Sequence, residues 1–294
     1  VLFSHASGES AWQFKHPTIG DAYATLLMQS PEHLDIFIQG SAPDRLIDQV
    51  TCGDVGLEKA IVVPKSLFPP MLARLREMLQ SRSYKTAWLS TFGAKRDLQG
   101  FLANRCSKEF LSLYLKDNPD LLDQVSEPGL FLDTVPEVRL AKRLHQFGLL
   151  PEEKRKKFVE TVSTYALDGQ DGDALDDDGI QSLFTSEEFE ELVHRVRTEL
   201  LPRLDDVRHE WESNHSAGEP PDEHMQQLLE FFSSVKERFM DDEGTVKLID
   251  RQIERTNEWI DENTPEEPER SPRKLGKIET PAESRSARSI FDDI

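Results

Sequence analysis

Cysteine is scarce in this chain, because Cys52 and Cys106 are the only two among 294 residues. They lie far apart in the sequence and form no C-x-x-C pair, which excludes a framework of disulfide bridges. Free cysteines usually behave as small buried apolar side chains. We therefore expect two buried thiols in a protein of the reducing cytosol.

Long apolar runs are also missing. The run at 60–63 ends at a proline, whereas a membrane helix needs roughly 18 to 20 apolar residues. The amino end has neither the basic region nor the apolar core of a signal peptide. We expect a cytoplasmic protein that makes no membrane contact. Because the chain begins with Val1 rather than Met, we also expect a fragment or a processed product.

Motifs of nucleotide-binding and catalytic sites are absent from the sequence. It contains no G-x-x-x-x-G-K-[ST] phosphate loop, no G-x-G-x-x-G, no G-x-S-x-G and no H-E-x-x-H. The eight histidines are scattered, and none is spaced with a Cys or Ser as a nucleophile and its base would be. We therefore predict that this chain is not an enzyme. We also predict that it has no catalytic residue, no metal site and no cofactor of its own.

Acidic residues crowd the stretch 168–179, which invites comparison with a calcium loop. An EF-hand loop needs oxygen ligands at positions 1, 3 and 5 and a glycine at position 6. If Gly172 is placed at position 6, Leu167 falls at position 1; if Gly179 is placed there, Ala174 does. Because neither register fits, we predict a solvated loop that joins two helices.

The net charge of −20 comes almost entirely from one segment. Residues 151–263 hold 31 acidic and 13 basic side chains, whereas the segments before and after them are nearly neutral. Such a segment repels phosphate backbones, so we predict that it does not bind nucleic acid. A basic protein partner and a merely well-solvated surface both fit this charge.

Proline and glycine divide the first 65 residues into short elements. Apolar spacing predicts two short helices within 12–40 and a third at 43–50. A turn cluster at 52–56 and a β-branched strand at 59–63 follow. Three helices, a turn and a strand are consistent with a winged-helix-like unit over residues 1–65.

The rest of the chain predicts helices of an all-α fold. Residues 66–150 show one apolar stripe after another, separated by prolines, which suggests stacked helical hairpins. Residues 151–263 predict four amphipathic helices in an acidic bundle, with Pro202 as a kink or break. Residues 264–294 are rich in proline and charge, and we predict a disordered tail with a terminal segment that could serve as a docking peptide.

One segment resembles a known family. The stretch 12–24, W-Q-F-K-H-P-T-I-G-D-A-Y-A, contains an aromatic residue, any residue, His16 and a proline, then a helix with an acid and an aromatic–alanine pair. It is similar to the segment that closes the winged-helix part of STAND NTPases (signal-transduction ATPases with numerous domains), including NACHT-like ones. The stretches 50–56, 139–155 and 198–207 look like C-terminal regions of the novel STAND proteins of bacteria.

The resemblance implies a non-catalytic regulatory or sensor region whose parent protein binds ATP or ADP and hydrolyses ATP. It implies that His16 faces the phosphates of that nucleotide, in a site that the parent's upstream NTPase domain completes. The implied partners are that domain and a protein trigger, with homo-oligomerisation as a further option. Bacterial members commonly act in signal transduction and antiviral defence against phage. From residue chemistry alone, His16 could instead simply cap the helix that begins at Pro17.

Two other functions stay open at this point. A stand-alone helical adaptor that binds proteins would need no NTPase parent. An enzyme would need a site spread over several helices, and a deep pocket lined by acids with shifted pKa values, near 171–178, would favour it.

Overall fold

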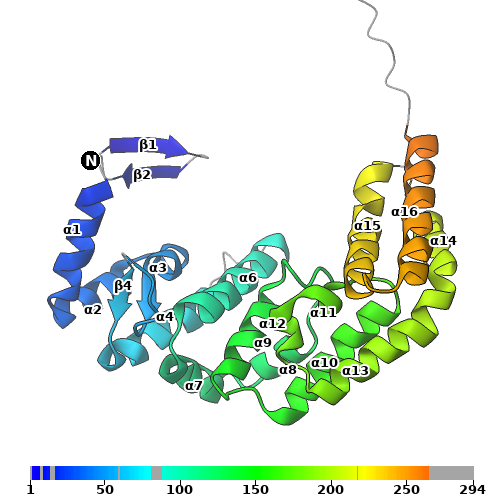
Figure 1. Cartoon of the computed structure of the whole chain (residues 1–294). Coiled ribbons are helices and arrows are strands. Elements are labelled where there is room, and N and C mark those ends of the chain that lie inside the picture. Colours follow the sequence, from blue (N-terminus) through cyan, green and yellow to red (C-terminus); the bar gives the residue numbers. More distant parts are fainter. Residues whose placement is uncertain are drawn as a thin grey trace, which may run out of the picture.

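The computed structural model describes residues 2–6, 9–13, 17–58, 60–80, 88–216 and 218–264. Helices make up most of this part of the chain, which confirms the predicted all-α class. The elements follow one another from the amino end to the carboxyl end as an elongated array (Figure 1). Among the described residues, every helix is too short or too polar to cross a membrane.

The amino-terminal part combines two small sheets with three helices. β1 (Leu2–Ala6) and β2 (Glu9–Gln13) pair antiparallel and lie at the start of α1 (Pro17–Met28) (Figure 1). Residues 12 and 13, which we expected in a helix, therefore belong to a strand. His16 lies outside the described residues, so its predicted place in a nucleotide site stays a prediction.

The three predicted helices are present, and prolines begin all of them. α2 (Pro31–Gly40) and α3 (Pro43–Gln49) follow α1, and α1 lies against α2. The predicted strand forms β4 (Ile61–Val63), and its partner is β3 (Val50–Cys52). β3 and β4 run parallel, so the loop between them crosses back over the pair instead of closing a hairpin.

Both cysteines lie at this small sheet. Cys52 and Cys106 are fully buried free thiols, which confirms the predicted burial. Although distant in sequence, they face each other in a parallel backbone bridge, and the Ser107 amide donates to the Cys52 carbonyl at 2.8 Å. Burial, followed by the contact with Cys52, raises the pKa of the Cys106 thiol.

The middle of the chain is helical throughout, as the apolar stripes predict. A short 3₁₀ turn (Lys65–Leu67) leads into this region. Its helices are α4 (Phe68–Gln80), α6 (Trp88–Arg105), α7 (Lys108–Asp117), α8 (Leu121–Ser126) and α9 (Pro136–Gln146). α4 packs on α2 and α3, and α6 packs along α9.

The described part of the acidic segment contains seven helices: the four predicted ones, the second of which is divided in two, and two short ones. They are α10 (Glu152–Leu167), α11 (Asp173–Asp176), α12 (Asp178–Gln181), α13 (Ser186–Arg195), α14 (Leu204–Asn214), α15 (Pro221–Arg238) and α16 (Glu243–Asn263). Pro202 interrupts the second long helix as predicted. A π turn (Val196–Leu200) and a 3₁₀ turn (Leu201–Arg203) separate α13 from α14.

Buried apolar side chains form one continuous cluster from Ala24 to Ile249. This cluster runs across the boundaries that we expected at 65/66 and 150/151, so neighbouring segments stabilise one another. The boundaries themselves stay predictions about sequence organisation. Residues 265–294, where we predicted a disordered tail, lie outside the described residues.

Arg155 of α10 anchors the start of α13. Its guanidinium is almost fully buried and donates to both carboxylate oxygens of Glu188, at 2.7 and 2.9 Å, and to the Leu183 carbonyl at 2.6 Å. Glu152 accepts two further bonds from it. Glu188 also closes a capping box with Thr185, so one carboxylate joins two helices. The bond from Arg155 lowers the pKa of Glu188 to about 2.

We expect Arg155→Met to lower the free energy of unfolding by about 3 kcal/mol, because it leaves a partly buried carboxylate and a carbonyl without their donor. Urea denaturation followed by circular dichroism measures this change. The matched control is Arg195→Met, which breaks an exposed pair with Glu199 one helical turn away and should cost about 0.5 kcal/mol or less. Equal losses in the two variants would contradict the anchoring role of Arg155.

Candidate functional site

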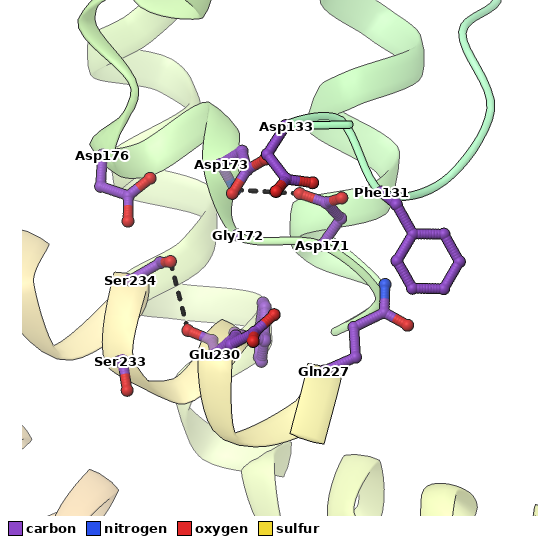
Figure 2. A pocket seen from close by; sticks show the side chains of 11 residues that line it. Phe131, Asp133, Asp171, Gly172, Asp173, Asp176, Gln227, Glu230, Ser233 and Ser234 are labelled. Atoms are coloured by element: carbon purple, nitrogen blue, oxygen red, sulfur yellow. Dashed lines mark hydrogen bonds between the residues drawn. The ribbon is translucent and has the colours of Figure 1, made fainter. Parts of the chain in front are cut away.

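An acidic hollow lies between the loop 127–135, which joins α8 to α9, the short helix α11 and the long helix α15. Its volume is about 350 Å³. Figure 2 shows carboxylates on one wall, the side chains of α15 on the opposite wall and Phe131 at the rim. The residues that line it are Phe131, Asp133, Asp171, Gly172, Asp173, Asp176, Gln227, Glu230, Phe231, Ser233 and Ser234.

Asp171 holds the hollow together. Its side chain is buried, and its two carboxylate oxygens accept hydrogen bonds from the Leu132 amide at 2.9 Å and the Asp173 amide at 3.0 Å. Burial is the largest influence on this carboxyl and raises its pKa, although the two amide bonds favour the charged form. The bond to Leu132 fixes the 127–135 loop to the turn that begins α11.

Asp173 is partly buried and lies among other carboxylates. Burial, together with the charges of Asp171, Asp176 and Asp133, raises its pKa to about 7. Burial also raises the pKa of Asp176, although the nearby Ser234 hydroxyl favours its charged form. At neutral pH the hollow therefore holds like charges that are only partly compensated by bound protons.

The neighbouring Asp177 behaves differently because a cation reaches it. Burial opposes its ionisation, but the ammonium of Lys142 at 2.8 Å and the Ile180 amide outweigh burial and lower its pKa. No Lys, Arg or His is among the residues that line the hollow itself. The carboxylates of the hollow therefore lack the kind of partner that Asp177 has.

Two residues with unusual backbone requirements, Phe131 and Gly172, lie on the walls of the hollow. Phe131 has a φ of 68°, a left-handed conformation that is uncommon for a bulky residue, and the residue is 54% exposed. On the other side, a Cβ at Gly172 would come within 2.6 Å of the Ser234 Cβ. Glycine thus permits the close approach of α11 to α15.

The structure corrects our expectation for the stretch 168–179. We predicted a solvated loop, but the stretch contains α11 and the start of α12, and Asp171 is only 6% exposed. The reason is that two backbone amides replace the water around its carboxylate. No group of three His, Cys, Asp or Glu residues is arranged as metal ligands within the described ranges, the acidic stretch included.

The sequence pointed to one wall of this hollow and missed the others. From the sequence, the acidic run at 171–178 was a place where carboxyls with shifted pKa values could line a pocket. No sequence pattern around Phe131, Gln227 or Ser234 indicated that these residues line the same hollow. Chemically, the hollow offers carboxylates, hydroxyls, an amide and an aromatic ring. These groups can bind a cation or exchange a proton, but the lining includes no Cys or His that could pair with a hydroxyl as nucleophile and base.

Comparisons of the chain with protein-family models, with curated proteins and with solved structures found no match. The family resemblance of the 12–24 stretch therefore stays a hypothesis.

We expect Asp173→Asn to raise the melting temperature at pH 8 by roughly 2 °C and to change it little at pH 4. The folded protein holds the proton of Asp173 more tightly than the unfolded chain does. The contribution of this carboxyl to the stability of the fold is therefore fully present at pH values below 3.8, its pKa in the unfolded chain. It is then lost as the pH rises through about 7. The neutral amide avoids that loss. Differential scanning calorimetry across pH 4 to 8 checks the trend, with the exposed Asp178→Asn as control. A gain that does not depend on pH would contradict this account.

Proposed function

We propose that this chain is a non-catalytic recognition region that binds a basic segment of a partner protein at the acidic hollow. We propose further that it serves as the C-terminal regulatory or sensor region of a STAND-class NTPase. The observation that carries the first proposal is the hollow, where several carboxylates and an exposed ring converge and the lining includes no positive side chain.

The chemistry of the hollow fits a cationic side chain. A lysine or arginine inserted there would replace the missing counter-charge of Asp171, Asp173 and Asp176. The exposed face of Phe131 at the rim adds a cation–π surface. A cavity of about 350 Å³ is large enough for such a side chain, because ligand pockets begin near roughly 300 Å³.

The charge of the surrounding helices supports the same partner. Residues 151–263 hold 31 acidic against 13 basic side chains, so the negative field extends well beyond the hollow. Such a field speeds the encounter with a basic segment and excludes acidic competitors. The proposed partner is therefore a protein with a lysine- or arginine-rich segment, not a nucleic acid.

The proposed place in a STAND protein rests on the resemblance around His16. In that setting the missing NTPase domain would bind ATP or ADP, and His16 would face the phosphates and help to hold the resting state. Partner binding at the acidic helices would then act on that resting state in signal transduction or antiviral defence. The gene sequence upstream of Val1 tests this: an in-frame phosphate-loop motif supports it, and an adjacent stop codon leaves the stand-alone adaptor.

One observation favours an enzyme as a second candidate. Asp173, with a pKa of about 7, could serve as a general acid or base at neutral pH. Acid–base catalysis also needs a reacting group held beside the carboxyl. The other polar groups of the lining are carboxylates, an amide and the hydroxyls of Ser233 and Ser234, and Ser234 bonds to the Glu230 carbonyl. We therefore keep recognition as the proposal.

We expect a lysine-rich peptide to bind the chain more tightly as the pH rises from 5 to 8, because the cation must displace the proton held by Asp173. Fluorescence anisotropy of a labelled peptide measures the affinity. Asp173→Asn should clearly reduce the pH dependence, and Phe131→Ala should weaken binding roughly threefold to tenfold.

The matched control is Asp178→Asn, which removes an exposed charge outside the lining of the hollow. It should lower the affinity for the peptide only slightly, because it removes one long-range attraction, and added salt should screen that attraction. If Asp173→Asn and Asp178→Asn give the same pH profile and the same affinity, the peptide binds the general surface and the hollow is not the site.

A further inference from the structure

A second hollow, of opposite character, lies between α3, α6 and α9 on the nearly neutral half of the chain. Its volume is about 270 Å³. Three arginines line it, Arg96 and Arg105 from α6 and Arg139 from α9, together with Asp48 and Asp97. This arginine hollow has no part in the function proposed above.

Two of these arginines converge on one oxygen atom. The Nη2 atoms of Arg96 and Arg139 both donate to the carbonyl of Thr134, at 3.1 and 3.2 Å. A carbonyl is neutral, so it orients the two guanidinium groups without cancelling their charge. Two like charges thus lie beside each other at the edge of a cavity, an arrangement that an anion between them would stabilise.

The third arginine is held in the same way. Arg105 is half-buried, and its Nη1 donates weakly to the carbonyl of Val50 at 3.5 Å. Within the described residues, none of the three arginines forms an ion pair. Arg155 and Arg208, by contrast, are surrounded by carboxylates. The charges of the three arginines are therefore available to a ligand.

Asp48 and Asp97 set what kind of anion can bind. Both line the hollow, and neither forms an ion pair among the residues that the structure describes. They leave the lining only slightly positive, so charge alone attracts an anion weakly. A carboxylate has two oxygens and can occupy one guanidinium fork, whereas a phosphate has enough oxygens to take paired N–H donors from more than one fork at once.

We propose that the arginine hollow binds the phosphate group of a small phosphorylated molecule. Arg96 and Arg139 take the phosphate oxygens, and Arg105 completes the contact from the inner wall. The Thr134 carbonyl keeps the first two forks in position before the ligand arrives, which lowers the ordering cost of binding.

Titration with inorganic phosphate, followed by calorimetry and by NMR shifts of the arginine side chains, tests the site. We expect saturable binding of phosphate, and no saturable binding of acetate at matched ionic strength and pH. Arg96→Gln and Arg139→Gln should each weaken phosphate binding at least about tenfold. Arg139→Lys, which keeps the charge but loses the fork, should weaken it less than Arg139→Gln.

Two further variants separate the site from general charge. Arg45→Gln removes an exposed arginine of α3 that does not line the hollow, and it should leave phosphate binding unchanged. Asp97→Asn should strengthen binding, because it removes a repelling carboxylate without removing a donor. Circular dichroism verifies that each variant is folded. Equal effects of Arg45→Gln and Arg96→Gln, equal binding of acetate, or no saturable binding would each overturn the proposal.

Discussion

The hydrogen bond from the Leu132 amide to the Asp171 carboxylate, at 2.9 Å, organises the centre of this protein. It joins residues 39 positions apart and fixes the loop that connects α8 to α9. A buried carboxylate is costly unless backbone donors replace its hydration, and here two amides do so. The position of Asp171 in turn brings Asp173 and Asp176 to the wall of the acidic hollow.

The same loop connects the two hollows. Phe131 lies at the rim of the acidic one, while the Thr134 carbonyl, three residues later, orients two arginines of the other. This short segment thus contributes to both hollows. It also provides a physical path by which occupation of one hollow could alter the other, because a shift of the loop moves groups in both.

Most helices could be predicted from the sequence because their signals are local. Prolines begin α2, α3, α9 and α15, and Thr185 with Glu188, three residues later, forms a capping box at the start of α13. The interruption at Pro202 has the same local cause, the missing amide of proline. The strand β4 was also foreseeable from its β-branched residues, but its parallel partner β3 was not, because pairing depends on how the chain folds back.

The sites were less predictable because they depend on contacts between distant segments. The acidic stretch showed where charge gathers, yet burial of Asp171 requires an amide from a loop that no local pattern connects to it. Phe131 and Thr134 occur in a stretch with no recognisable motif, and their roles follow from backbone geometry. The pairing of Cys52 with Cys106 is likewise a product of tertiary structure that the spacing of two cysteines does not reveal.

The sealed position of those two cysteines has a practical consequence for spectroscopy. Both sulfur atoms are inaccessible to water, and the chain contains no other thiol. A cysteine placed at an exposed position, such as Leu130 within the connecting loop, would therefore be the preferred target for a maleimide dye or a spin label. Two such exposed cysteines would make a distance across the molecule measurable, without the replacement of any residue of the core.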